Sequence, residues 1–417
     1  MSRQYHFSTV TVSKDHDGTV NNPFSSLSAL KDIVLSPGDI IALECGSVFM
    51  GEYIHLRNID AITIKPYGQG KRPVIATDSN GVWHQDYGTP LDSPSHRYKA
   101  DISSSIHLQD CSGIRIEGLE LTNTDDGDKY EAFRMCHTGV SAVAKDRGVM
   151  KNITLHDLYI HNIKGNVYDK HLNNGGIYMT CSKPRNEDET GPALFENITI
   201  SRCTVTDTSR WGIAVGYTYA HSAFSGKTCD RTAFEKYAHK NIVIEDCYVK
   251  RSGGDAITVM YALSPRVSRN RSDDAALEIN DRIYRHPEGR GGKVAAAIWP
   301  WKCLDAHFTG NDVYSTRLNQ DGMAYDADSG WNTVYEHNRS TLNEGGAVMF
   351  CLEEAIGSVY RNNVSDNDLG GIFSLASNPD GIINGNKIIK KKTVPLLRKR
   401  MDDGKVMMYD NILTEEE

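Results

Sequence analysis

Short runs of alternating apolar and polar residues recur along the chain, and each belongs to a unit of similar design. A unit has one short run, a polar turn with Asn or Asp, a second run, a Gly-containing bend and a third run. The clearest units begin at Lys151, Glu196, Lys240, Thr333, Ser358 and Gly381. The later starts, at 333, 358 and 381, are 25 and 23 residues apart. Three short strands in a repeat of roughly 20 to 25 residues predict a parallel β-helix, whose stacked coils bury a continuous core.

This pattern predicts an all-β, single-domain solenoid of about ten coils that spans residues 1–417. We expect an N-terminal cap and first strand in 1–45, coils in 46–390 and a C-terminal cap in 391–417. The main competitor, a leucine-rich repeat, needs regularly placed Leu and Asn positions that these units lack.

The ends of the solenoid also have recognisable patterns. An amphipathic helix covering the first coil is predicted from four apolar residues at helical spacing: Phe24, Leu27, Leu30 and Ile33. Near the other end, we interpret the Lys and Arg runs at 390–392 and 398–400 as solvated surface.

Four long stretches interrupt the units, at 77–101, 182–194, 217–239 and 262–292. Long loops in a compact domain are uncommon unless they are functional. All four are expected to leave the coil after its third strand. On a solenoid, loops on one side build the walls of a binding groove.

The third strands of the units can be aligned on their bend residue, which predicts which side chains face the core. One inward column contains Ile177, Ile213, Ile257, Met323, Ala347 and Ile372, and the next contains Met179, Val215, Val259, Tyr325, Met349 and Ser374. The outward column contains Thr180, Gly216, Met260, Asp326, Phe350 and Leu375. Asp326 and Asp328 therefore face outward from one strand, whereas Asp321 is expected to cap a turn.

Two outward carboxylates on a rigid strand suit glycosidic bond cleavage, in which one acts as acid and the other as nucleophile or base. Residues two apart on a strand are roughly 6.6 Å apart and adjacent rungs roughly 4.8 Å. Both distances are near the about 5 to 9.5 Å that glycosidases use, so retention and inversion are both open. Asp326 and Asp328 are the leading catalytic candidates, followed by Glu353 and Asp255.

Aromatic and polar residues are predicted to line the same groove, because flat apolar sugar faces pack on aromatic rings and hydroxyl groups bond polar side chains. The candidate substrate-binding residues are Trp299, Trp301, Lys302, Trp211, Tyr217, His171 and Asn174. The predicted partner is therefore a carbohydrate.

These features make the chain resemble the pectate-lyase-like superfamily of right-handed parallel β-helix proteins. NPFSSL…LSPGD…LECGSVFMGEYIHL resembles its cap and first coil, and DGMAYDADSG…NEGGAVMFCLEE is similar to the aspartate-bearing coils of β-helix glycoside hydrolases. Such families include xylosidases, fucosidases and lacto-N-biosidases, so the resemblance implies hydrolysis by paired carboxylates.

Two other functions stay open at this point. A polysaccharide lyase that eliminates across a uronate needs a basic residue, for which Lys302 or Arg210 could serve. A non-catalytic glycan-binding solenoid would depend on Trp299 or Trp301 rather than on the carboxylates.

The composition of the chain argues against several classes of partner and cofactor. The net charge of −8 argues against nucleic acid and anionic membranes, both of which need a basic surface. The nine cysteines show no zinc-type spacing, and Cys203 and Cys247 share a repeat position, which predicts stacked core thiols. Clustered aspartates could bind Ca²⁺, but no EF-hand-type loop is present, so we expect no metal or other cofactor.

The sequence says little about where the protein is located and how it assembles. The N-terminus lacks the apolar segment of a secretion signal, which predicts a cytoplasmic protein, or a secreted one if the start was processed. The oligomeric state is left open by the sequence.

Overall fold

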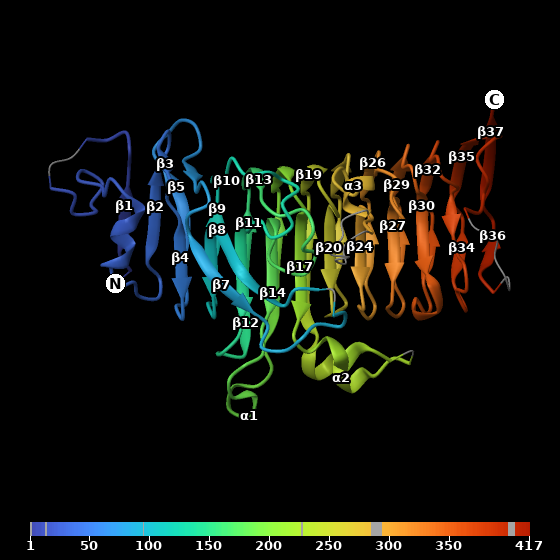
Figure 1. The fold of residues 1–417 in the computed structure, drawn as a ribbon, viewed down its shortest axis with the longest axis horizontal. Coiled ribbons are helices and arrows are strands. Elements are labelled where there is room, and N and C mark those ends of the chain that lie inside the picture. Colours follow the sequence, from blue (N-terminus) through green and yellow to red (C-terminus); the bar gives the residue numbers. More distant parts are fainter. Residues whose placement is uncertain (1, 13–14, 95, 227, 285–293, 399–404) are drawn as a thin grey trace.

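A computed structural model describes residues 2–12, 15–94, 96–226, 228–284, 294–398 and 405–417. The chain winds into a right-handed parallel β-helix in which successive coils add strands to three long sheets (Figure 1). The predicted fold class is therefore confirmed. Among the described residues, no helix is both long and apolar enough to cross a bilayer.

Sheet 1 contains β1 (Gln4–Phe7), β2 (Ile40–Glu44), β5 (Thr63–Tyr67), β9 (Arg115–Glu117), β12 (Val149–His156), β15 (Leu194–Ser201), β18 (His239–Glu245), β21 (Ala262–Leu263), β22 (Arg266–Ser268), β25 (His307–Thr309), β28 (Val334–Glu336), β31 (Val359–Arg361), β34 (Ile382–Asn384) and β36 (Met407–Tyr409). Sheet 2 contains β3 (Val48–Met50), β6 (Val74–Ala76), β10 (Glu120–Thr124), β13 (Tyr159–Lys164), β16 (Thr204–Thr208), β19 (Tyr248–Ser252), β23 (Arg271–Asp273), β26 (Asp312–Tyr314), β29 (Arg339–Thr341), β32 (Val364–Asp366), β35 (Lys387–Lys391) and β37 (Ile412–Glu416).

Sheet 3 contains β4 (Ile54–Arg57), β8 (Lys99–Gln109), β11 (Cys136–Ala144), β14 (Gly175–Cys181), β17 (Trp211–Thr218), β20 (Ile257–Met260), β24 (Ile298–Trp301), β27 (Met323–Asp328), β30 (Gly346–Cys351) and β33 (Phe373–Ser374), with β7 (Val82–Asp86) antiparallel to β8. The short helices are η1 (Leu27–Lys31), α1 (Glu187–Thr190), η2 (His221–Phe224), α2 (Arg231–Tyr237), α3 (Asp281–Tyr284) and η3 (Leu352–Glu354).

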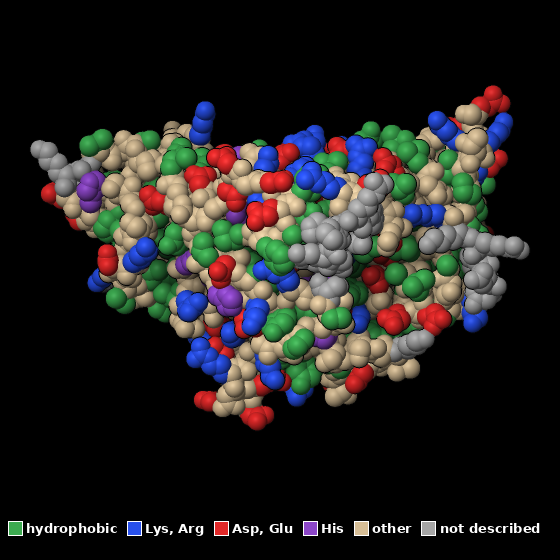
Figure 2. Space-filling model, viewed as in Figure 1, with side chains coloured by type: hydrophobic (Ala, Val, Ile, Leu, Met, Phe, Trp, Pro, Cys, Tyr) green, Lys and Arg blue, Asp and Glu red, His purple; other side chains and the backbone are tan. Residues whose placement is uncertain are grey.

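The solenoid interior is filled by one continuous apolar core that all three sheets share. Cys203 and Cys247 lie in this core, as predicted, and all nine cysteines are free. The described surface in Figure 2 intersperses Lys and Arg with Asp and Glu side chains.

The turn between sheets 1 and 2 is held by a ladder of asparagines, all buried except the last, which is half-buried. The ladder contains Asn270, Asn311, Asn338, Asn363, Asn386 and Asn411. Each of the first five donates from Nδ2 to Oδ1 of the next, and each also donates to a backbone carbonyl of the preceding coil, as Asn338 does to Phe308 (3.0 Å). The ladder therefore satisfies turn groups that would otherwise be buried without partners.

The amphipathic helix predicted for the N-terminal cap is wrong in type and length. Its four apolar residues pack on the core as expected, but only Leu27 and Leu30 lie in a helix, the short 3₁₀ helix η1, with strand β1 before it. Their spacing of three residues matches the 3₁₀ repeat rather than the 3.6 residues of an α-helix. At the other end, residues 391–417 include β36 and β37, which continue sheets 1 and 2.

The insertions do not all leave after the third strand. The 182–194 and 217–239 stretches follow β14 and β17, and their helices α1 and α2 project from one long side of the solenoid (Figure 1). The 77–101 stretch instead precedes β8 in sheet 3. Residues 262–273 form ordinary strands β21 to β23, so the fourth insertion begins after β23. The insertions thus flank sheet 3 at both strand ends.

The predicted columns are wrong for some residues in and beside β27, β30 and β33, although Tyr325, Ala347 and Ile372 lie in the inner core as predicted. Tyr325 pairs with Val348, which pairs with Phe373, and these three face the inner core. Phe350 and Leu375, predicted outward, lie in the inner core, whereas Met323, Met349 and Ser374, predicted inward, face outward. The bends differ in length, and a slip of one residue exchanges the two faces of a strand. Tyr325 faces inward and Asp326 and Asp328 face outward, as predicted.

We predict that Asn338→Ala lowers the free energy of unfolding by about 2 to 4 kcal/mol, because the backbone N–H of Asn311 and the carbonyl of Phe308 lose their bonds to the Asn338 side chain. Urea denaturation measures the change. Asn384→Ala, at a half-buried site on β34, two rungs from β28, serves as control and should shift stability by less than about 0.5 kcal/mol. Equal losses in the two variants would show that the ladder adds nothing special.

Candidate active site

The outer face of sheet 3 carries a second apolar cluster, which we call the outer aromatic cluster. Its large aromatic side chains are Trp83, Tyr87, Tyr178, Trp211, Tyr217, Phe224, Phe234, Tyr261, Trp299 and Trp331, and Trp301 packs against it. Strands β11, β14 and β17 are buried on both faces, so the inserted loops cover the sheet there. The outward residues of these three strands are therefore shielded from solvent.

Asp326 and Asp328 lie on β27 beside the tryptophans of β24. Ile298 pairs with Tyr325 and Trp301 with Asp328, so Trp299 lies beside Asp326. On the other side, Asp326 pairs with Met349 and Asp328 with Cys351. Ligand atoms of Asp326, Asp328 and Cys351 all lie within 4.8 Å of one another. The two carboxyl groups predicted from the sequence are therefore adjacent.

Burial and mutual repulsion shift the proton affinity of this group. Burial raises the pKa of Asp326 well above its ordinary value, and the charges of Asp328 and Asp321 raise it further. Asp326 is only 3% exposed, and its Oδ1 has no hydrogen-bond partner among the described residues. That environment favours the protonated form of Asp326.

Asp321 joins the same group rather than capping a turn, so that expectation is wrong. Asn319 Oδ1 caps this turn instead, accepting from the backbone N–H of Asp321 (2.7 Å) and of Ala295 (3.2 Å). Burial, with the charges of Asp328 and Asp255, raises the pKa of Asp321 to about 6. Asp321, Asp326 and Asp328 therefore form an acidic trio, in which Asp321 and Asp328 are partly exposed.

Asp328 differs from the other two in its local partners. Burial raises its pKa, but a hydrogen bond from Ser329 (2.6 Å) and the positive charges of Lys170 and Lys302 oppose the rise. Asp328 is thus the member of the trio with the most groups that favour its ionised form.

Lys170 is a central residue that the sequence reasoning missed. Its Nζ lies 5.1 Å from the centre of the Trp299 ring, and its charge opposes the rise in pKa of all three aspartates. It comes from the 165–174 loop before β14, distant in sequence from β27. The HLNNGG motif directly after it was the available signal.

Asp255 and Arg210 form a buried support behind the tryptophans. Asp255 is fully buried, accepts from Trp299 Nε1 (3.0 Å) and from Ala296 N (3.2 Å), and pairs with Arg210 (3.6 Å). Trp211, also buried, donates from Nε1 to the Lys170 carbonyl (2.7 Å). These groups orient Trp299 and Lys170, and neither Asp255 nor Arg210 is exposed to a substrate.

A polar group borders the aromatic side of the trio. Tyr217 and His171 lie in it, and Asp92 and His96 from the 77–101 insertion complete it. Sequence analysis missed Asp92 and His96, because no local motif ties that loop to His171. Asn174 is buried and donates to the carbonyls of Asn166 and Asp169, so it holds the loop instead of facing the groove.

Two hollows open beside the trio and share Cys351 and Leu352. The larger, about 480 Å³, is lined by Asn319, Gln320, Asp321, Met349, Phe350, Cys351, Leu352, Ser374, Ala376 and Arg398. Glu353 is exposed in η3 and lines the smaller hollow, of about 340 Å³.

Arg398 donates to the carbonyl oxygens of Asp321 and Gln320, and Lys390 is 4% exposed, so the solvated-surface interpretation is wrong for both residues.

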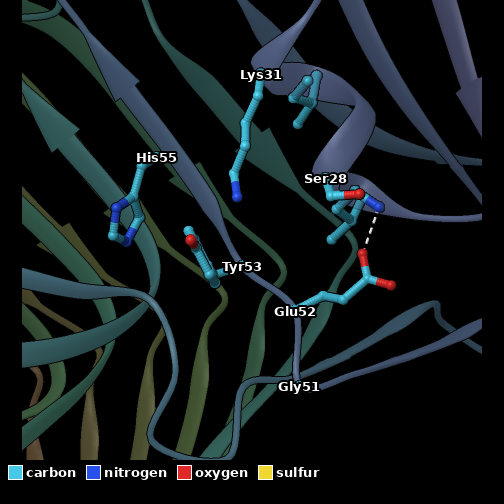
Figure 3. A pocket seen from close by; sticks show the side chains of 8 residues that line it. Ser28, Lys31, Gly51, Glu52, Tyr53 and His55 are labelled. Atoms are coloured by element: carbon cyan, nitrogen blue, oxygen red, sulfur yellow. Dashed lines mark hydrogen bonds between the residues drawn. The ribbon is translucent and has the colours of Figure 1, made fainter.

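A further hollow, of about 410 Å³, lies at the N-terminal end of sheet 3 between η1 and Tyr53 (Figure 3). Its Glu52 accepts from the backbone N–H of Leu27 and so ties η1 to the first coil. Strands β4 and β27 are seven rungs apart, about 34 Å at the usual strand spacing. This hollow is therefore remote from the acidic trio.

The trio and Cys351 do not fit a calcium ion. Ca²⁺ takes six to eight oxygen ligands, and raised pKa values favour the protonated carboxyl groups that bind it poorly. Burial also raises the pKa of the Cys351 thiol, which keeps it protonated. The absence of a cofactor stays a prediction.

No family model matches the sequence. The chain is 38% identical over 448 residues to a lacto-N-biosidase of Bifidobacterium longum subsp. longum, matching 95% of this chain but only 28% of that protein. Two crystal structures of a GH136 lacto-N-biosidase from Eubacterium ramulus, native and selenomethionine derivative, are 48% identical and superpose with a TM-score of 0.96. The match covers 99% of this chain and 68% of the E. ramulus chain. The resemblance to β-helix glycoside hydrolases is thus confirmed.

We predict that Asp326→Asn raises the free energy of unfolding at pH 8, because the buried carboxyl group is costly to ionise. The pKa of Asp326 is higher in the folded than in the unfolded chain, so its contribution to stability falls as pH rises above about 4. The gain in the variant should therefore shrink toward zero near pH 4. Denaturation at several pH values measures it, with the exposed Asp126→Asn as control. A pH-independent difference would contradict the raised pKa.

Proposed function

This chain belongs to the GH136 lacto-N-biosidase family, and from that membership we propose a glycoside hydrolase that cleaves the bond joining a lacto-N-biose unit to an oligosaccharide. The chain spans only 28% of the length of the curated relative, so the activity and the substrate of this chain are both proposals. The observation that carries the proposal is the pair of partly exposed carboxyl groups, Asp321 and Asp328, flanking the buried Asp326.

Within the pair, Asp321 is the general acid. Its pKa of about 6 leaves part of the population protonated near neutral pH, and it lines the larger hollow beside the trio. A carboxylic acid in that state can protonate the departing glycosidic oxygen.

Asp328 is the nucleophile or base. The positive charges of Lys170 and Lys302 and the Ser329 hydroxyl favour its carboxylate form, which attacks the anomeric carbon or activates water. Trp301, its partly exposed neighbour on β24, offers an aromatic face to the sugar.

Asp326, the leading candidate from sequence, receives a supporting role. Its side chain is almost fully buried, and burial together with the charges of Asp328 and Asp321 raises its pKa. It therefore adjoins the pair as a carboxyl group that favours its protonated form and does not contact the substrate itself. Asp255 supports the site indirectly, by accepting the hydrogen bond from Trp299 Nε1. Glu353 lies at the rim of the smaller hollow.

The lyase alternative loses one of its two candidate bases, because Arg210 is fully buried against Asp255. The other, Lys302, lies 5.7 Å from the centre of the Trp301 ring and beside a hydrolytic pair of carboxyl groups. Hydrolysis is therefore the function that the site supports best.

We predict that Asp321→Asn and Asp328→Asn each lower kcat by about 10²- to 10⁴-fold on an oligosaccharide that ends in lacto-N-biose, because its sugar leaving group needs a proton and each variant removes a group that acts in the transition state. Glu353→Gln should lose less than about tenfold, because Glu353 is exposed at the rim. The rate of disaccharide release, followed by chromatography, measures these losses.

Full activity in Asp321→Asn or Asp328→Asn, with folding intact, would remove that residue from the mechanism. Glycan binding by a wild-type protein that hydrolyses no member of a glycoside panel would instead favour the non-catalytic solenoid.

A further inference from the structure

We propose that the hollow between η1 and the first rung of sheet 3 is a separate, non-catalytic binding site for an acidic sugar, a pyranoside that carries a carboxylate. Six of its lining residues carry the argument: Leu27, Leu30, Lys31, Glu52, Tyr53 and His55. Its volume of about 410 Å³ is in the range of small-molecule sites. Because the hollow is seven rungs from the acidic trio, this inference does not rest on the proposed hydrolysis.

The alternation of residues in the first coil builds one wall of the hollow. Ile54 and Leu56 of β4 point into the inner core, so Tyr53, His55 and Arg57 point to the outer face of sheet 3. The rings of Tyr53 and His55 lie 4.6 Å apart. This wall therefore presents aromatic surface to a ligand.

The aromatic wall is supported from the next rung. His55 pairs with His107 of β8, and the two rings are 5.3 Å apart. His107 is buried and stacks on Trp83 of β7 at 4.0 Å. These contacts hold the wall in one orientation, so binding a ligand there requires little reordering.

The helix η1 forms the opposite wall and contributes apolar surface. Leu27 is buried, and the partly buried Leu30 packs against the inner core. Glu52 Oε2 accepts from the backbone N–H of Leu27 and from the Ser26 hydroxyl (3.1 Å). These two hydrogen bonds anchor η1 to the first coil and fix the width of the hollow.

Lys31 brings a positive charge into the hollow. Its side chain reaches toward Tyr53 and His55 (Figure 3), and its Nζ lies 5.8 Å from the centre of the Tyr53 ring. Burial lowers the pKa of His55 to about 4, and the nearby charges of Arg57 and Lys31 lower it further, so this ring is neutral near pH 7. Within the described part of the chain, no carboxylate forms an ion pair with Lys31 or Arg57.

Glu52 supplies an acceptor elsewhere in the same hollow. Its carboxyl group is turned toward the start of η1 (Figure 3), and both hydrogen bonds from that region go to Oε2. Among the residues that the structure describes, no donor reaches Oε1. The hollow thus combines an unpaired cation, an aromatic ring and a carboxylate oxygen that can accept from a hydroxyl group.

An acidic pyranoside complements all three features. Its carboxylate pairs with Lys31 and accepts from the Tyr53 hydroxyl, which bonds no other described residue. The apolar face of its ring packs on Tyr53, and a ring hydroxyl donates to Glu52 Oε1. A neutral sugar would leave Lys31 unpaired, and an acid without hydroxyl groups would leave Glu52 without a donor. Uronic acids and sialic acids share this chemistry.

NMR titration of the whole protein with methyl glucuronide, methyl sialoside and neutral methyl glucoside tests the site. For wild type we expect at least one acidic glycoside to bind with a Kd at least tenfold below that of the glucoside, and the better acidic ligand identifies the source. Lys31→Met should abolish this preference, and Tyr53→Phe should weaken acidic binding at least threefold. The control is Lys71→Met, an exposed lysine outside the hollow, which should stay within about twofold of wild type.

Equal Kd values for acidic and neutral glycosides in wild type would overturn the inference. So would unchanged acidic binding in Lys31→Met, whose melting temperature should match wild type because Lys31 is exposed. Hydrolysis of an oligosaccharide that ends in lacto-N-biose should be the same in Lys31→Met and wild type, and a loss there would contradict a separate site. If wild type hydrolyses nothing but shows the expected binding pattern, the proposed function fails and the acidic-sugar site stands.

Discussion

The site depends on one constraint, the register of the parallel ladder that joins β24, β27 and β30. Tyr325 and Ala327 point into the inner core, and the strand between and beyond them has to present Asp326 and Asp328 outward. The same register puts Trp299 and Trp301 on one side of the aspartates and Met349 and Cys351 on the other. A slip of one residue would bury both carboxyl groups in the apolar core.

This arrangement has an energetic cost that the fold tolerates because the core holds the register. Two like charges on one strand face repel each other, and burial adds to the penalty. Part of the penalty is avoided when a carboxyl group keeps its proton, which is the state that a general acid requires. Lys170 and Lys302 then favour the charged form where it is needed, at Asp328. The burial and charge repulsion that destabilise the site also raise the pKa values on which its proposed chemistry depends.

The repeat architecture was predictable from the sequence because each coil repeats the same alternation of apolar and polar residues. The outward placement of Asp326 and Asp328 followed from the same alternation. The columns in β30 and β33 did not, because the bends before them differ in length and sequence spacing does not reveal that difference. The apolar residues in and beside η1 are spaced three apart, which is the repeat of a 3₁₀ helix and not the 3.6 residues of an α-helix.

Contacts between insertions were beyond the reach of the sequence. Lys170, Asp92 and His96 lie in loops whose positions depend on tertiary packing, and no local pattern links them to β27. Asp321 was assigned to a turn cap because its neighbour Asn319, which fills that role, was not considered. Asp255 and Arg210 were candidate catalytic groups in the sequence, but their complete burial makes them supports of Trp299 and not contacts for a sugar.

The central claim is that register and burial give the three aspartates different proton affinities. Carbon-13 NMR of aspartate carboxyl groups across pH, assigned with the single Asn variants, measures this directly. We expect Asp321 to titrate near pH 6 and Asp326 to titrate well above its ordinary range. Titration of all three near the ordinary value of 3.8 would contradict it.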